Sequence, residues 1–158
     1  MDDIDGKRHY AEEVALLMEA EGMPRMAGRI LGWLLVCDPP HRTLNELAED
    51  LQASKGSISS MTRYLEGLGL IEQFSIPGIR PDYYRLEPEN WIGAMKQGIG
   101  RVIAFRELME QGMALVKNDP PEVEARLAGL RDMYAFFERE LPDLIVKWEK
   151  ERKAKRAG

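Results

Sequence analysis

Residues 43–69 read TLNELAEDLQASKGSISSMTRYLEGLG, and the spacing of their apolar residues predicts two short helices joined by a tight turn. Thr43 stands three residues before Glu46, which is the pattern of a capping box at the start of the first helix. Ser54 is the expected N-cap of the second helix, and Gly69 is the expected C′ residue after its end. Two helices with so short a link are typical of a helix-turn-helix.

The second of these helices has one apolar face and one polar face. Helical geometry places Ile58, Met61, Leu65 and Leu68 together on the side expected to be buried. The opposite side is small, polar and cationic, and it carries Lys55, Gly56, Ser59, Ser60 and Arg63, with Ser57 and Thr62 near its margins. Hydroxyl groups and cations can meet phosphates and base edges, and small residues allow a close approach. We interpret this face as a DNA-reading surface; the alternative is an ordinary solvated helix face.

The sequence on either side completes the domain. Residues 5–20 and 24–37 have helical spacing. After the helix-turn-helix the pattern becomes extended, and residues 70–75 and 82–86 read as two strands around a turn-rich tip. Three helices followed by a hairpin predict a winged helix-turn-helix over residues 23–87, in a mainly α fold with a small β-hairpin wing.

Three further cations are candidates for DNA contact. Arg80 lies in the wing tip between Gly78 and Pro81, where it could reach the minor groove; its alternative is a turn arginine held by local carbonyls. Arg25 and Arg29, near the start of the helix over residues 24–37, could meet phosphates or pair with acids, and the sequence leaves both open. The predicted DNA-binding residues are therefore Ser54, Lys55, Gly56, Ser57, Ser59, Ser60, Arg63, Arg80, Arg25 and Arg29.

Residues 88–158 return to helical spacing. Apolar residues follow steps of four and three over residues 91–116 and again over residues 123–148, which predicts a helical hairpin. Pro142 predicts a kink or a restart in the second helix, and the basic residues 150–158 are expected to form a frayed, solvated tail.

A single helical hairpin buries too little apolar surface by itself. We therefore expect residues 88–158 to be a dimerisation region of a homodimer, joined in the dimer layer by an N-terminal helix within residues 1–22. Aromatic residues could also enclose a small ligand between the DNA-binding and dimer layers, for which a cation such as choline would be suitable, although core packing is the preferred interpretation. These residues are Tyr10, Trp33, Trp91, Phe105, Tyr134, Phe136, Phe137 and Trp148.

Composition restricts the other functions. The net charge is −5, with most of the acidic excess in residues 1–23, so DNA binding would depend on a few well-placed cations. A single cysteine, Cys37, is expected as a buried core thiol, with a redox sensor as the alternative, and the few cysteines and histidines predict no metal site and no cofactor. Motifs typical of enzymes are absent from the sequence, and so are the roughly 18 apolar residues of a membrane span and a signal peptide. We expect a cytoplasmic protein that is not an enzyme and does not bind a membrane.

Four motifs in the first half resemble the GbsR-like branch of the MarR superfamily: GMPRMAGRILG (residues 22–32), TLNELA (43–48), SKGSIS (54–59) and PGIRPDYY (77–84). The resemblance covers about residues 20–87. It implies a homodimer that binds operator DNA, usually as a repressor, with residues 54–68 in the major groove and the Arg80 wing beside it. Well-known members govern osmoprotectant uptake or synthesis, but no motif here identifies a small-molecule effector.

A different function remains open from the sequence alone. Residues 24–86 carry no net charge, so the winged helix could instead serve protein contacts in a larger complex. The two functions differ in an observable property, because neutralising phosphates makes DNA binding strongly dependent on salt.

Overall fold

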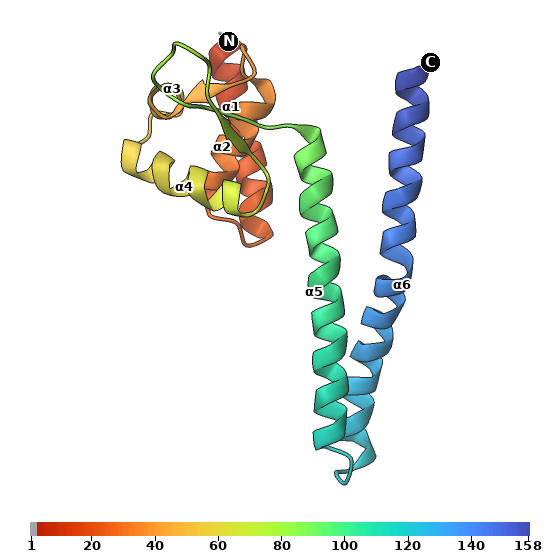
Figure 1. Ribbon diagram of the computed structural model, residues 1–158. Helices are drawn as coiled ribbons and strands as arrows, with labels where there is room; N and C mark the ends of the chain where they lie inside the picture. The colour runs from red at the N-terminus through yellow and green to blue at the C-terminus, as the bar shows by residue number, and fades with distance from the viewer. Residues whose placement is uncertain (1–2) are drawn as a thin grey trace. The chain divides into compact units, whose positions relative to one another are not determined.

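The computed structural model describes residues 3–158, and the chain divides after Trp91 into two compact units. The elements of the first unit, before the long C-terminal helices, are α1 (Asp3–Ala20), α2 (Arg25–Val36), β1 (Arg42–Thr43), α3 (Leu44–Asp50), α4 (Lys55–Gly67), β2 (Glu72–Phe74) and β3 (Tyr83–Arg85) (Figure 1). The helices α5 (Pro88–Leu115) and α6 (Pro121–Ala157) follow. The predicted mainly α fold, with a winged helix-turn-helix followed by a helical hairpin, is confirmed.

The wing belongs to a small antiparallel sheet with the strand order β1-β3-β2. Tyr84 of the central strand pairs with Arg42 on one side and with Gln73 on the other. The two wing strands are shorter than predicted, and β1 was not predicted at all. A strand of two residues has no measurable periodicity, so only its pairing with β3 identifies it.

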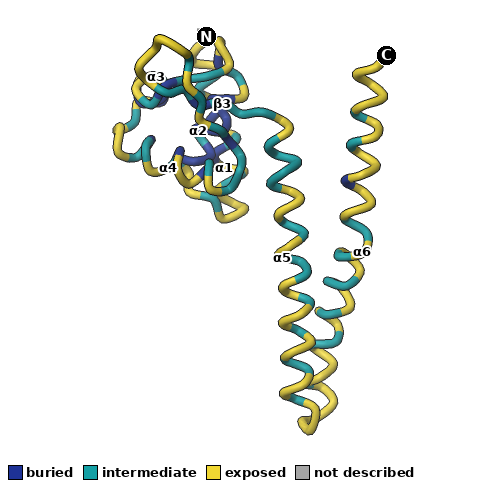
Figure 2. The backbone as a smooth tube through the Cα atoms, viewed as in Figure 1, coloured by how far each residue is buried: buried dark blue, intermediate teal, exposed yellow. Residues whose placement is uncertain are grey.

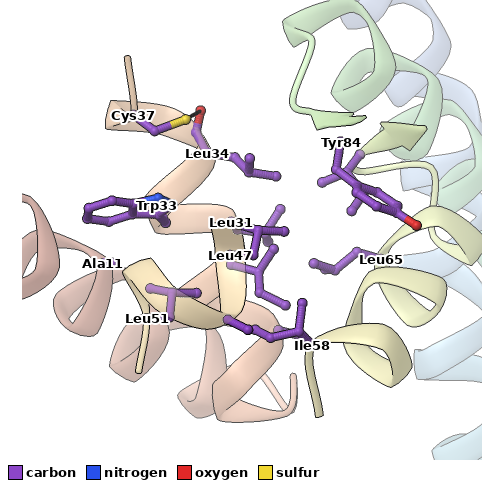
Figure 3. Close-up of a cluster of buried hydrophobic side chains, with 14 residues drawn as sticks. Ala11, Leu31, Trp33, Leu34, Cys37, Leu47, Leu51, Ile58, Leu65 and Tyr84 are labelled. Carbon is purple, nitrogen blue, oxygen red and sulfur yellow. Dashed lines mark hydrogen bonds between the residues drawn. The ribbon is translucent and has the colours of Figure 1, made fainter. Parts of the chain in front are cut away.

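The core of the first unit lies between α2, α3, α4 and the sheet. Buried residues are concentrated in this unit, as the dark blue segments of Figure 2 show. In Figure 3 the side chains of Leu31, Leu47, Ile58 and Leu65 point toward one another, with Tyr84 closing the cluster from the sheet. Burial of these apolar groups fixes α4 by its inner face and leaves its outer face to solvent.

Helix ends in this unit are closed by local hydrogen bonds. The capping box is confirmed, because Thr43 Oγ1 accepts from the Glu46 N–H at 3.2 Å and Glu46 Oε2 accepts from the Thr43 N–H at 2.8 Å. At the end of α4, Gly69 has a φ of 72° and the N–H of Leu70 bonds the carbonyl of Leu65 at 3.0 Å, which is a Schellman motif. The prediction of Gly69 as the C′ residue is therefore correct.

The inner face of α4 differs from the prediction at three residues. Thr62, expected near the margin, is only 1% exposed, whereas Met61 and Leu68 are half-buried. The Thr62 hydroxyl donates to the carbonyl of Ser59 at 3.0 Å, so its polar group is satisfied within the helix. A threonine bonded in this way can occupy a core position that sequence spacing assigned to larger apolar residues.

The second unit is a helical hairpin with little buried surface of its own. Phe105 and Tyr134 stack at 5.2 Å between ring centroids, and Lys96 pairs with Glu149 at 2.5 Å. The helix α6 runs through Pro142 without the predicted restart and continues to Ala157, so residues 150–157 are helical and not frayed, although nearly all of them are exposed as predicted. A proline inside a helix removes one backbone hydrogen bond and crowds the carbonyl four residues before it, which favours a bend rather than a straight helix at this point. Within residues 3–158, no helix has both the length and the apolar character that crossing a bilayer requires.

Candidate nucleic-acid interface

The outer face of α4 places most of the predicted DNA-binding residues together. Ser54, Lys55, Gly56, Ser60 and Arg63 are exposed, and Ser57 and Ser59 are half-buried. Among the residues that the structure describes, Lys55 and Arg63 have no hydrogen-bond or ion-pair partner. A Cβ built on Gly56 would meet nothing within 4 Å, so no internal contact requires a glycine there. The face therefore offers two uncommitted cations beside open space.

The hydroxyl group of Ser54 serves the helix itself. Its Oγ accepts from the Ser57 N–H at 3.2 Å and caps α4. A capping serine still has its hydroxyl proton to donate outward, so the structural role and a phosphate contact are compatible.

The turn between α3 and α4 is held partly by residues of α1 and α2. Gln52 takes a positive φ of 51°, and the N–H of Ala53 bonds the carbonyl of Ala48 at 2.9 Å, so α3 also ends in a Schellman motif. Two arginines complete this end: Arg8 of α1 donates to the carbonyl of Asp50 at 2.8 Å, and Arg29 of α2 donates to that of Leu51 at 2.7 Å. A cation near a helix C-terminus also interacts favourably with the helix dipole. These contacts orient the turn that leads into α4.

Asp50 joins the same region to α2 and to the sheet. Its Oδ2 accepts from Trp33 Nε1 and from Arg42 Nε, each at 2.8 Å. Trp33 is thus a core residue with a satisfied indole N–H, in agreement with the core-packing interpretation of that aromatic residue.

Arg25 and Arg29 both turn toward an acid. Arg25 Nη2 lies 3.3 Å from a carboxylate oxygen of Glu12, and Arg29 pairs with the other oxygen of that carboxylate. Of the two alternatives that the sequence left open, these contacts show the ion pair with an acid. Arg25 remains half-exposed on its side chain, while Arg29 is largely enclosed.

The wing tip presents Arg80 to solvent. The N–H of Ile79 bonds the carbonyl of Ile76 at 3.0 Å, and Gly78 has a φ of 82°, which fits a type II turn with Pro77 before the glycine. Within residues 3–158, no carbonyl or carboxylate holds the guanidinium group of Arg80. The sequence alternative of a turn arginine held by local carbonyls is therefore not the arrangement seen.

Three polar residues that the sequence analysis did not single out brace this wing. The carboxylate of Asp82 accepts from Ser75 Oγ at 2.6 Å and from Gln73 Nε2 at 2.5 Å. Alternation along the two strands could have suggested this group, because residues 73 and 75 share one face of β2 and its extension. A hollow of about 280 Å³ lies beside them, between the wing and the start of α3.

The opposite face of the wing is aromatic and charged. Phe74 and Tyr83 stack at 5.8 Å, and the guanidinium of Arg85 lies 4.5 Å from the centre of the Phe74 ring. Arg85 also pairs with Glu72, and this hydrogen bond, followed by one from Asn90 at 3.2 Å, holds the pKa of the Glu72 carboxyl below its usual value. The base of the wing is thus fixed on both faces.

Cys37 lies at the end of α2 and is buried. Burial, as the largest cause, raises the pKa of its thiol. A raised pKa lowers the fraction of reactive thiolate, which favours the core-thiol interpretation over the redox sensor. In the part of the chain that the structure describes, no cluster of residues is suited to hold a metal ion.

Similarity to known proteins agrees with this geometry. Residues 89–151 match the family described as MmpR5-like MarR family transcriptional regulator. The chain is 34% identical over 139 residues to the HTH-type transcriptional regulator MmpR5 of Mycobacterium tuberculosis (strain ATCC 25618 / H37Rv), a match that covers 88% of this chain and 84% of that protein. It is 32% identical over 134 residues to the HTH-type transcriptional repressor OpcR of Bacillus subtilis (strain 168), covering 77% and 70% respectively. A crystal structure of a transcriptional regulator matches with a TM-score of 0.79 at 32% identity, over 92% of this chain and 99% of that chain.

Proposed function

This chain belongs to the MmpR5-like MarR family of transcriptional regulators, and we propose that it represses transcription as a homodimer bound to operator DNA. In this proposal α4 lies in the major groove and the Arg80 wing lies over the neighbouring minor groove. The MarR resemblance expected from the sequence is confirmed at the level of the family. Its GbsR-like branch stays a prediction.

The observation that carries the DNA-binding proposal is the exposure and pairing of three cations. Lys55, Arg63 and Arg80 are exposed, and within residues 3–158 none of them has an ion-pair partner. The other five arginines of the first unit, at positions 8, 25, 29, 42 and 85, are each paired with an acid or bonded to a carbonyl. Cations left unpaired on one helix and one wing are available to phosphates and guanine edges.

The dimer proposal is supported by apolar surface on the hairpin. The helix α5 has no buried residue, and α6 has only Ile145 among the residues described. Large side chains are open to solvent on both helices: Met95, Phe105, Leu108, Leu115, Leu130, Met133, Phe136, Phe137, Leu144, Val146 and Trp148. Exposed apolar surface on this scale marks an interaction site, and a second copy would cover it symmetrically.

Repression and a response to a small ligand extend the proposal. Repression is suggested by the name of the relative OpcR, whereas no residue of this chain identifies the ligand. A regulator of this kind would act in the cytoplasm and through DNA occupancy, without catalysis.

The test is binding to duplex DNA as a function of salt. Fluorescence anisotropy would compare the DNA upstream of the protein's own gene with a random duplex of equal length. We expect tighter binding to the upstream DNA and, on both duplexes, an affinity that falls steeply as salt rises. Absence of salt-dependent binding to either duplex would contradict the proposal and favour the protein-contact module.

A further inference from the structure

The wing contains a side-chain clasp next to Arg80. The ladder of β2 and β3 ends at the pair Phe74 and Tyr83, so its register makes Ser75 and Asp82 the next opposing residues. Ser75 Oγ donates to one carboxylate oxygen of Asp82 at 2.6 Å, and Gln73 Nε2 donates to the other at 2.5 Å. Both carboxylate oxygens of Asp82, just before β3, thus accept hydrogen bonds from residues in or just after β2. We call this group of Asp82, Ser75 and Gln73 the clasp.

The clasp is close in sequence to the exposed cation Arg80. Asp82 is two residues from Arg80, and Pro81 between them has its φ fixed by the pyrrolidine ring. A fixed Asp82 therefore limits the directions in which Arg80 can project. Side chains and loops that are ordered before binding lose less conformational entropy when they bind.

The negative charge of Asp82 distinguishes a positioning role from a purely electrostatic one. A carboxylate on a surface that approaches phosphates adds repulsion, so an acid beside Arg80 is unfavourable for DNA binding if charge alone matters. Hydrogen bonds to an ionised carboxylate are stronger than those between neutral groups, which gives the clasp a holding strength that a neutral side chain would lack.

We propose that Asp82 is a positioning residue for DNA binding: bonded to Ser75 and Gln73, it fixes the wing loop so that Arg80 is presented to the DNA. The inference rests on the proposed function. It assigns Asp82 no direct contact with DNA.

Substitution of Asp82 separates positioning from charge because the two effects have opposite signs. If Asp82 positions Arg80, Asp82→Ala removes both hydrogen bonds of the clasp and weakens binding by about tenfold, the low end of what the loss of hydrogen bonds to a charged group costs. Ser75→Ala keeps the acid and removes one donor, so it weakens binding in the same direction. Asp119→Ala, which removes an exposed acid from the loop between α5 and α6, is the matched control and leaves binding unchanged or slightly tighter.

A double-mutant cycle with Arg80 tests whether the effect passes through that residue. Arg80→Ala lowers affinity for all sequences and reduces the salt slope by about one unit. In that background Asp82→Ala causes no further loss, because there is no cation left to position. An equal loss with and without Arg80, or tighter binding by Asp82→Ala alone, overturns the inference.

Hydrogen exchange of the free protein gives a readout that does not depend on DNA. The Ile79 amide, whose hydrogen bond to the carbonyl of Ile76 closes the wing turn, exchanges faster in both Asp82→Ala and Ser75→Ala, while the thermal midpoint stays close to that of the wild type. Unchanged exchange in the wing overturns the inference even if the wild type binds DNA. A wild-type protein without salt-dependent binding instead overturns the proposed function, and this inference with it.

Discussion

Gly28 of α2 lies directly against Ala15 of α1, so that a Cβ built on Gly28 would be 2.7 Å from the Cα of Ala15. The relationship repeats one turn further on, where a Cβ on Gly32 would be 2.7 Å from the Cα of Ala11. Both alanines are fully buried. The two backbones touch along this line, and α1 is therefore an integral part of the unit that carries the helix-turn-helix.

Gly28→Ala should destabilise the protein, although alanine is the better helix former. Helix propensity favours alanine by about 1 kcal/mol, but the added methyl group meets backbone that cannot move aside. We expect a net loss of about 1–3 kcal/mol in the free energy of unfolding, measured by urea denaturation. Gly56→Ala is the matched control, because its Cβ meets nothing within 4 Å; it should not destabilise the protein. Equal effects of the two substitutions would contradict the packing argument.

Ser59→Glu with Ser60→Glu should abolish DNA binding and leave the fold intact. Two carboxylates on the outer face of α4 would repel phosphates in a partly desolvated interface, where like charges can cost several kcal/mol. In the free protein Ser60 is exposed and Ser59 half-exposed, so the new charges stay hydrated. A mobility-shift assay beside a thermal melt measures both properties.

The control for that experiment makes the same change of net charge elsewhere. Lys117→Glu lowers the net charge by two at an exposed residue of the turn between α5 and α6 and should retain DNA binding. A folded Ser59→Glu, Ser60→Glu protein that still binds would show that α4 does not face the DNA.

The chain should sediment as a dimer at micromolar concentration. Leu108 of α5 and Leu144 of α6 are 54% and 59% exposed, so neither side chain is buried by its own hairpin. Leu108→Glu with Leu144→Glu should shift sedimentation toward the monomer, because charges at an apolar interface are costly to bury. A monomeric wild type in analytical ultracentrifugation would refute the dimer.

Glu72→Gln should destabilise the protein at neutral pH but not in acid. The hydrogen bond from Arg85 holds the pKa of Glu72 below the value of 4.5 expected for an unperturbed glutamate. A carboxyl with a lowered pKa in the folded state stabilises the fold above its unfolded pKa, and this contribution is lost as the pH falls through the folded pKa. Both side chains are more than one third exposed, so we expect a difference of less than about 1 kcal/mol.

The measurement is urea unfolding of wild type and variant at pH values from about 7 down to about 3. The two curves should converge at the acid end. In an Arg85→Gln background the same substitution should have a smaller pH dependence, since the main partner of Glu72 is absent. A difference that persists unchanged into acid would mean that Glu72 acts through packing.

The sequence by itself determined the order of the helices and the caps of α3 and α4, because the signals for these are local. Capping by Thr43 and Ser54 and the left-handed residue Gly69 depend on neighbours within a few residues, and the structure shows all three in their predicted roles. The outer face of α4 follows from helical periodicity in the same way. Whether its residues bind DNA stays a prediction.

Only the tertiary structure decided which polar side chains form hydrogen bonds or ion pairs and which stay open to solvent. Arg29 and Arg80 are both arginines near a turn or a helix end, yet Arg29 is enclosed between Glu12 and the carbonyl of Leu51, and Arg80 is open to solvent. The partners of Arg29 are 17 and 22 residues away, and those of Asp82 lie on the other strand of the wing. Such contacts are set by how helices and strands pack, which local periodicity does not specify.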